Sequence, residues 1–295
     1  MQAMQPLDSH IKSHLTQCLV DIGEKLGTDV VTIISPIVPG LEHRLRQAIE
    51  TLLEHKRAVT IILDTPGGVV EVVERMVAVI RFIYQEVVVI VPDRAMSAGT
   101  ILALSADKIM MDHFSCLGPI DPQIEREGQL VPALSYLNQY ERLNDKARNG
   151  ELSTAEYALL VKLDLGELHQ FEQAREPSID LLKKWLTQYK FKNWTRTETR
   201  EKKVTESMKE TRAREIAELL NDPEKWRTHG RGIDAATLRD SVGLKIDNLE
   251  EDDQLYQAIR GYFELLRDYT YKNNSISFVH SRKYVTTCPR YQLPS

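Results

Sequence analysis

One serine of this sequence stands in the setting that covalent catalysis requires. Ser97 lies in the compact segment Ala95-Met96-Ser97-Ala98-Gly99, directly before an apolar stretch with helical spacing. Small neighbours permit a sharp strand-to-helix turn that projects the hydroxyl, as in a nucleophile elbow, although Ala95 stands where hydrolase elbows carry glycine. The alternative interpretation is that Ser97 is a helix N-cap, a position that serine favours.

A glycine turn supplies the second part of the expected chemistry. The apolar stretch at 58–64 ends in Thr65-Pro66-Gly67-Gly68, which is a strong turn signal. We expect the N–H groups of Gly68 and Ala98 to bind the oxyanion of an acyl-transfer reaction, each lowering the barrier by about 3 kcal/mol. The start of the helix after Ser97 also favours developing negative charge. A plain tight turn is the alternative interpretation of the two glycines.

The elements around both features predict a parallel sheet. Residues 58–64 and 87–91 are almost wholly apolar, which is typical of strands buried on both faces. Residues 69–84 between them carry an apolar stripe at helical spacing. This strand–helix–strand unit brings the two turns to the same edge of a sheet, where open α/β folds place their sites.

The rest of the sequence predicts further strands and many helices. Strands are expected at 30–34 and 108–111, with a short one at 275–279. Helices are expected at 7–26 and 41–56, through much of 132–192, up to about residue 220, and near 234–241 and 252–268. We therefore predict a catalytic core over residues 1–192 and a helical C-terminal extension over residues 193–295.

Two pieces of the sequence resemble a known peptidase family. ILDTPGG (62–68) and DRAMSAGTILALSADKIMMDHFSCLGPIDPQ (93–123) are similar to the serine dehydrogenase proteinase family, which is related to signal peptide peptidase A and to the Clp proteolytic subunit. The resemblance is close over about residues 28–125. It implies an α/β fold of the ClpP/crotonase type, built from ββα units. It also implies Ser97 as the nucleophile, with the Gly68 and Ala98 N–H groups as the oxyanion hole.

The resemblance also guides the search for a general base. The histidine of the Clp subunit would fall within residues 118–122, but this stretch holds none, and His113 comes too early. The signal peptide peptidase A group uses a Ser-Lys pair instead. Its pattern implies Lys146, just before the helix start at 153–156, with Lys162 as the second choice. A lysine base must be neutral near pH 7, which requires burial or nearby positive charge. A solvated helix face is the alternative for either lysine.

Three further sites deserve an interpretation. His229, in the segment 226–232, could approach the site from the C-terminal part, contribute to a subunit contact, or pack in a turn. Asp121 could orient the base, shape a substrate pocket, or act as a turn residue between two prolines. Asp112-His113 shows no spacing that supports a metal site, so none is predicted.

Composition restricts the partners and the compartment. The 295 residues carry a net charge of -5, which gives no electrostatic reason to expect nucleic acid or an anionic membrane. Three cysteines without a CxxC pair favour reduced thiols, and the N-terminus lacks the pattern of a signal peptide. No apolar run approaches the roughly 20 residues that span a bilayer. These features predict a cytoplasmic protein without an integral membrane segment.

The combined expectation is a serine peptidase that cleaves peptide bonds by acyl transfer, without a metal or organic cofactor. A dehydrogenase activity is not predicted, because the sequence has no GxGxxG fingerprint and no recognisable site for pyridoxal phosphate. The resemblance implies a homo-oligomer and a peptide or protein substrate, with membrane-protein substrates left open. Two alternatives remain: a ClpP-like oligomeric scaffold without catalysis, and a crotonase-type enzyme that acts on acyl-CoA.

Overall fold

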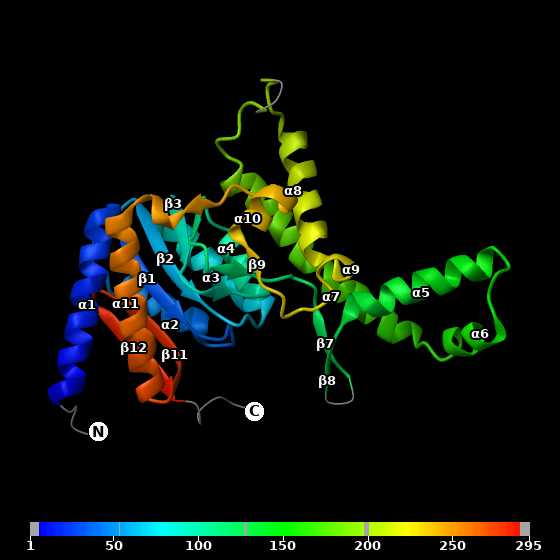
Figure 1. The fold of residues 1–295 in the computed structure, drawn as a ribbon, viewed down its shortest axis with the longest axis horizontal. Helices are drawn as coiled ribbons and strands as arrows, with labels where there is room; N and C mark the ends of the chain where they lie inside the picture. Colours follow the sequence, from blue (N-terminus) through cyan, green and yellow to red (C-terminus); the bar gives the residue numbers. More distant parts are fainter. Residues whose placement is uncertain (1–5, 53, 127–128, 198–200, 290–295) are drawn as a thin grey trace.

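A seven-stranded sheet forms the centre of the molecule (Figure 1). The computed structural model describes residues 6–52, 54–126, 129–197 and 201–289. The strand order is β10-β5-β3-β2-β1-β11-β12. These strands are β1 (Asp29–Ile34), β2 (Ala58–Asp64), β3 (Glu86–Val91), β5 (Lys108–Met111), β10 (Asp247–Asn248), β11 (Ser275–Ser281) and β12 (Tyr284–Pro289). From β10 to β1 the pairs are parallel, whereas β11 and β12 are antiparallel to their neighbours.

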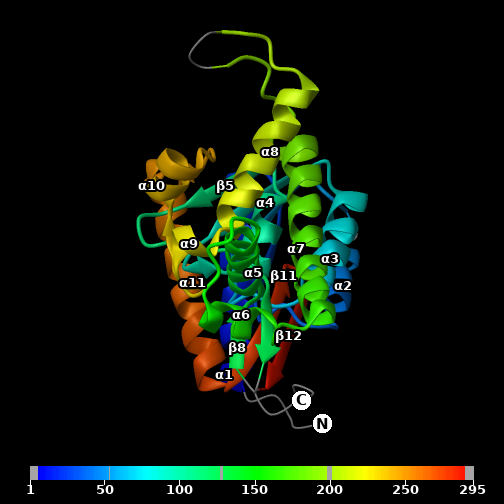
Figure 2. The same ribbon diagram turned by 90° about the vertical axis from the view of Figure 1, so that its right-hand side faces the viewer.

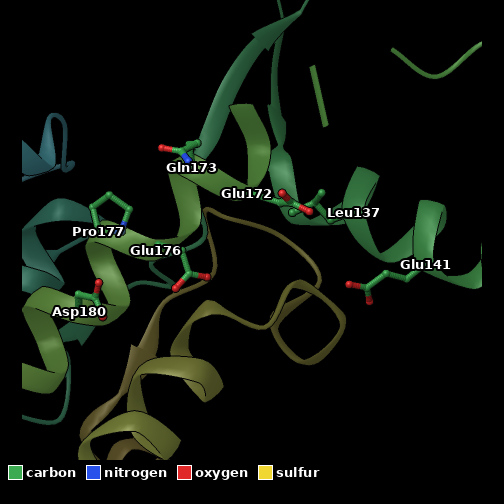
Figure 3. A pocket seen from close by; sticks show the side chains of 7 residues that line it. All are labelled: Leu137, Glu141, Glu172, Gln173, Glu176, Pro177 and Asp180. Carbon is green, nitrogen blue, oxygen red and sulfur yellow. The ribbon is translucent and has the colours of Figure 1, made fainter. Parts of the chain in front are cut away.

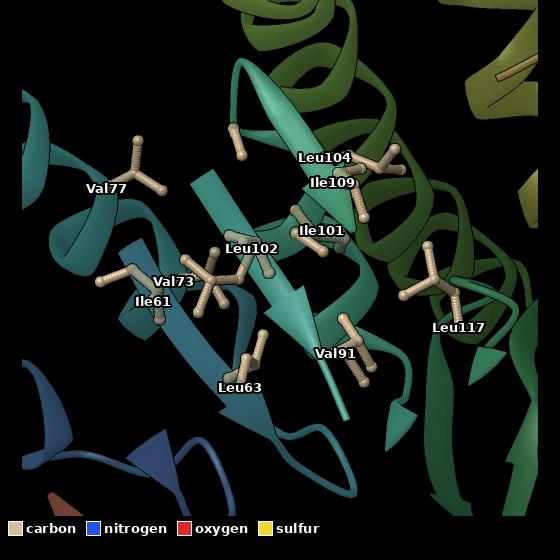
Figure 4. Packing of buried hydrophobic residues seen from close by; sticks show 14 of the residues in the cluster. Ile61, Leu63, Val73, Val77, Val91, Ile101, Leu102, Leu104, Ile109 and Leu117 are labelled. Atoms are coloured by element: carbon tan, nitrogen blue, oxygen red, sulfur yellow. The ribbon is translucent and has the colours of Figure 1, made fainter. Parts of the chain in front are cut away.

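The parallel strands form where β-branched residues are concentrated. β2 and β3 lie side by side in parallel register, with Ile61 opposite Val89. Successive side chains of a strand point to opposite faces, so each strand contributes to two cores. Leu63 faces one core (Figure 4), whereas Ile62 and Ile90 face the other. Burial on both faces explains why these strands show no polar alternation.

Helices cover both faces of the sheet (Figures 1 and 2). The first face carries α1 (Pro6–Leu26) and α11 (Asp253–Lys272). The second face carries α2 (Leu41–Glu50), α3 (Val70–Ile83) and α4 (Ala98–Leu104), with α7 (Leu165–Trp185) and α8 (Glu206–Asn221) packed against them. The predicted apolar stripe of α3 is confirmed, and its buried residues are Val72, Val73, Met76, Val77 and Ile80. Full burial of one such aliphatic side chain stabilises the fold by roughly 1.5–3 kcal/mol.

A small second sheet joins distant parts of the chain. Its strands, in the order β4-β6-β9, are β4 (Arg94–Ala95), β6 (Cys116–Leu117) and β9 (Ile233–Asp234). β4 and β6 are parallel, and β6 and β9 are antiparallel. The helix α9 (Pro223–Trp226) precedes β9, and α10 (Ala235–Thr237) and the π-helix η2 (Leu238–Val242) follow it, whereas the 3-10 helix η3 (Leu249–Glu251) lies between β10 and α11. This sheet places the segment before β9 close to the segment that follows β6.

An arm leaves the sheet between β6 and α7 (Figure 1). It begins with the hairpin of β7 (Gln123–Arg126) and β8 (Gln129–Pro132). It continues through α5 (Ala133–Arg148) and α6 (Thr154–Leu160), and α6 has no buried residue. The chain then returns along α7 and the short π-helix η1 (Leu186–Lys190). The helical character predicted for residues 132–192 is therefore confirmed.

The α/β class is confirmed, whereas the helical extension over residues 193–295 is an incomplete prediction. That part contains helices, but it also adds β10 to one edge of the sheet and β11 and β12 to the other. β11 pairs with β1 and buries Phe278 and Val279, one toward each core. These two apolar side chains thereby extend the core on each face of the sheet at this edge. The boundary between residues 192 and 193 stays a prediction.

Within the described ranges, no helix is both long enough and apolar enough to cross a bilayer.

Candidate active site

Ser97 occupies a strained turn between β4 and α4. Its φ is 50° and its ψ is -116°, a region that residues with side chains seldom adopt. Ser97 stands at the N-cap position of α4, yet its side chain makes no capping hydrogen bond. The interpretation of Ser97 as a side-chain cap is therefore wrong. A half-buried serine in a strained strand-to-helix turn is instead the geometry of a nucleophile elbow.

Two glycines bring the neighbouring turn into contact with this serine. A Cβ on Gly67 would lie 2.7 Å from the Met96 carbonyl oxygen and 2.9 Å from the Ser97 Cβ. A Cβ on Gly68 would overlap the Ile37 carbonyl oxygen. Both glycines have positive φ, 100° and 147°, which side-chain-bearing residues adopt at a cost. Glycine is therefore required at both positions by contact and by conformation.

The backbone leaves two N–H groups free at this junction. The Ile37 N–H donates to the Gly67 oxygen and the Ile37 oxygen accepts from the Val69 N–H, both at 2.8 Å. Gly68 lies between these two bonds, so its own N–H points to the other side of the segment. The Ala98 N–H belongs to the first residue of α4, where no intrahelical acceptor exists. Neither N–H has a hydrogen-bond partner within the described residues.

The buried side chain of Thr100 bonds the start of α4 to the segment that follows β6. The Thr100 hydroxyl lies 2.8 Å from the Gly118 oxygen and accepts the Gly118 N–H at 2.9 Å. A Cβ on Gly118 would lie 2.7 Å from the Met96 side chain, so this segment passes directly against the elbow. The Met96 N–H in turn donates to the Thr65 oxygen at 3.0 Å. These contacts hold the strained Ser97 between residues 65–68 and 116–118.

A buried carboxylate and an imidazole meet next to this segment. Asp121 is 3% exposed, and its Oδ1 lies 2.8 Å from Nδ1 of His229, while its Oδ2 accepts from Gln123 at 2.8 Å. In the pairing of β6 with β9, Leu117 is opposite Ile233, and the same register continued outward sets residue 121 opposite residue 229. Sequence reasoning identifies both residues but cannot pair them, because they are 108 positions apart.

The predicted lysine base lies on the arm. Lys146 is in the last turn of α5, and its ammonium is 2.5 Å from a carboxylate oxygen of Glu156. This hydrogen bond lowers the pKa of Glu156 to about 2. Glu156 also closes the capping box of α6 with Ser153. The structure does not bring Lys146 into contact with Ser97 within one chain, and Lys162 is exposed in the turn after α6. Both lysine assignments stay predictions.

The remaining acidic and histidine candidates have structural partners. Asp112 accepts hydrogen bonds from the N–H groups of Phe114 and Ser115, as a turn residue does. His113 lies 2.6 Å from Glu250, on the surface near η3. Neither residue takes part in the junction around Ser97.

The sequence profile of the ClpP-like SDH-type serine proteinases matches residues 38–204, more than half of the chain. The chain belongs to this family. The resemblance seen in residues 62–68 and 93–123 is confirmed, and so is the ClpP-like α/β fold. The matched range includes Ser97, the glycine turn and Lys146, whereas His229 lies beyond it.

Two curated relatives are similar to part of the chain. Both are uncharacterised proteins of Methanocaldococcus jannaschii, MJ1495 and MJ0137. They are 36% identical over 115 residues and 41% identical over 103 residues. The matches cover 39% and 35% of this chain, and only 36% and 35% of the relatives' own lengths.

Several solved proteases show a distant likeness. Two structures of the 1510-N membrane-bound stomatin-specific protease, one in complex with a substrate peptide, are 16% identical, with TM-scores of 0.43 and 0.44. They cover 90% of this chain, and the match spans 97% and 91% of their own chains. ClpP1 from Listeria monocytogenes is 21% identical, with a TM-score of 0.30, over 53% of this chain and 91% of its own.

Proposed function

We propose that this protein is a serine peptidase in which Ser97 forms the acyl-enzyme. The observation that carries the proposal is the strained Ser97 elbow in contact with the Gly67-Gly68 turn, in a chain of a serine proteinase family. The Ser97 oxygen attacks the carbonyl carbon of a peptide bond, and the Gly68 and Ala98 N–H groups bind the oxyanion. The C–N bond then breaks, the amine leaves with a proton, and water hydrolyses the serine ester.

The base that takes the Ser97 proton has two candidates. The family resemblance supports Lys146 and hence a Ser-Lys pair. Lys146 could serve only after leaving Glu156 and losing its charge, and the arm of one chain or of a second copy would have to carry it to the site. In the structure its ammonium is held by the Glu156 carboxylate instead of facing Ser97.

The second candidate is the His229–Asp121 pair. A carboxylate that accepts from Nδ1–H of a histidine fixes the tautomer in which Nε2 is an acceptor, as a catalytic base requires. Nε2 of His229 has no hydrogen-bond partner among the described residues, and the side chain is 26% exposed. Within a single chain these contacts support His229, because Gly118, three residues before Asp121, passes against the elbow.

Peptide or protein substrates follow from this chemistry, and no cofactor is required by it. Three free cysteines, Cys18, Cys116 and Cys288, support the proposal of a reducing, cytoplasmic compartment. The family's ClpP-like character supports the proposal of a homo-oligomer. Sedimentation of the purified protein tests that assembly.

Cleavage of a mixture of quenched fluorescent peptides tests the peptidase assignment. The wild type is expected to cleave a subset of the peptides and the Ser97→Ala variant none. Equal cleavage by both proteins would contradict the proposal. Retention of CoA thioesters by the purified protein, without peptide cleavage, would favour the acyl-CoA enzyme instead.

A further inference from the structure

An acidic groove runs between α5, α7 and α8. One part has a volume of about 480 Å³ and is bordered by the carboxylates of Glu141, Glu172, Glu176 and Asp180 (Figure 3). A second part has a volume of about 460 Å³ and is bordered by the carboxylates of Glu141, Glu215, Glu218 and Asp222. Glu141 borders both parts, so they adjoin each other, and the two together are called the acidic groove.

Most of these carboxylates have no ion-pair partner among the described residues. Glu215 pairs with Arg212 at 2.8 Å, and Glu172 pairs with His169 at 3.6 Å. The other five carboxylates of the acidic groove make no ion pair with any described residue: Glu141, Glu176, Asp180, Glu218 and Asp222, the last of which caps α9. Like charges gathered in one concave surface create a negative potential that attracts cations.

A buried amide adds an independent sign of a ligand. Asn221 lines the second part of the acidic groove and is only 2% exposed. Neither its amide oxygen nor its amide nitrogen has a hydrogen-bond partner in the described part of the chain. Buried polar groups are nearly always paired, so this amide is available to hydrogen-bond a group that enters the acidic groove. An amide offers one acceptor and two donor hydrogens, which suits a peptide group.

The acidic groove adjoins the segment next to Ser97. The Ile120 N–H donates to the Leu220 oxygen at 3.0 Å, directly before Asn221. The next residue, Asp121, holds His229. A chain bound at the elbow could therefore continue into the acidic groove without leaving the surface.

We propose that the acidic groove binds a lysine- or arginine-rich stretch of the peptide that Ser97 cleaves. This inference rests on the proposed peptidase function and names its substrate class. An extended polycation fits better than a metal ion, because no three carboxylate, cysteine or histidine groups of the described residues converge on one point. Spaced carboxylates match cationic side chains that are spaced along a peptide.

Peptide binding to the full-length Ser97→Ala protein tests this inference without turnover. The probes are a fluorescein-labelled peptide of alternating Lys and Ala and its counterpart of alternating Glu and Ala. Anisotropy is expected to show binding of the lysine peptide only, weakened by added salt. The double variant Glu141→Gln and Glu218→Gln is expected to weaken binding about fivefold.

A matched double variant controls for net charge. Glu24→Gln and Glu74→Gln remove two exposed carboxylates on α1 and α3 that make no ion pair with any described residue, and binding is expected to stay unchanged. Equal weakening in both double variants would show general charge attraction and overturn the inference. If the wild type reacts at Ser97 but the lysine peptide does not bind, the proposal for the acidic groove is overturned and the peptidase proposal stands. If the lysine peptide binds but Ser97 of the wild type is unreactive, the peptidase proposal is overturned instead.

Asn221→Leu provides a second, sharper test. Leucine has a similar volume and removes an unpaired buried amide, so the melting temperature is expected to stay equal or rise. Binding of the lysine peptide is expected to weaken at the same time, because the bound chain loses its hydrogen bonds. A drop in melting temperature with unchanged binding would show that the amide is structural and overturn its role in the groove.

Discussion

Gly68 shows how tightly single residues are constrained around Ser97. Gly68→Ala would place a Cβ on the Ile37 carbonyl oxygen and force a φ of 147° on alanine. We expect a loss of about 1–3 kcal/mol in the free energy of unfolding, as for other overpacked sites. We also expect roughly a hundredfold slower reaction of Ser97, because the proposed oxyanion donor, the Gly68 N–H, moves. Urea unfolding and probe kinetics measure the two effects.

Gly27→Ala is the control for backbone strain. Gly27 also has a positive φ, 66°, but a Cβ there would meet no atom within 4 Å. This variant is expected to lose some stability and to keep the reactivity of Ser97. A similar loss of reactivity in both variants would contradict the specific role of Gly68.

Single variants distinguish His229 from Lys146 as the general base that takes the Ser97 proton. His229→Ala is expected to slow reaction at Ser97 by about 10²–10⁴-fold, the usual contribution of a general base, and added imidazole should restore part of the rate. Asp121→Asn should show a smaller loss. Lys146→Met is expected to leave the rate within about twofold of the wild type. Loss of reaction in Lys146→Met but not in His229→Ala would assign the role to Lys146 instead.

Residue types and local spacing predict only part of this site. Ser97, Gly68 and Ala98 lie within two short segments, so a turn signal and an elbow pattern identify them from the sequence. The contact between Asp121 and His229 depends on the pairing of β6 with β9, which no local pattern encodes. The position of Lys146 depends on the direction of the arm, which spacing along the chain does not determine.

At the scale of elements, the capping box of α6 and its contact with Lys146 of α5 hold the outer part of the arm together. Ser153 caps α6 and Glu156 completes the capping box while it binds Lys146. Because the pKa of Glu156 is lowered to about 2, its contribution to the cap is present above about pH 4.5 and is lost as the pH falls toward 2. In a carboxyl-carbon NMR titration, Lys146→Met is expected to raise the midpoint toward the ordinary value for glutamate. An unchanged midpoint would contradict the contact.

Element boundaries follow from the sequence where strong local signals exist. The Ser153–Glu156 spacing predicts the start of α6, and the apolar stretches predict β2 and β3. β12 is not predicted, because its residues alternate weakly and its pairing with β11 depends on the sheet edge. The π-helix η1 likewise has no sequence signal, since its hydrogen bonds depend on packing against α8.

At the scale of the whole molecule, a buried histidine links stability to pH. His280 is fully buried, where Tyr262 and Thr16 lie within hydrogen-bond distance of its two ring nitrogens. Burial lowers the pKa of His280 to about 4. The unfolded chain therefore binds a proton below about pH 6.5 that the folded chain does not, so stability falls as the pH drops from about 6.5 to 4. The full effect is about 3 kcal/mol.

The measurement is urea unfolding of the wild type and of His280→Gln at several pH values. Burial raises the pKa of Asp64 to about 6, which stabilises the folded chain as the pH falls and acts against His280. Both proteins share the Asp64 effect, so the difference between them isolates the histidine. The stability advantage of the wild type over the variant is expected to shrink with falling pH. A constant difference would contradict the burial of a neutral imidazole.

We propose that Ser97 is an activated nucleophile in an assembled oxyanion hole. Treatment of the purified protein with a fluorophosphonate probe, followed by mass spectrometry of its peptides, is the decisive test of this assignment. The structure predicts one adduct, on Ser97, that is absent from a folded Ser97→Ala protein. A folded wild type that stays unlabelled, even with peptide substrate present, or labelling that persists in Ser97→Ala, would contradict the claim and favour a scaffold.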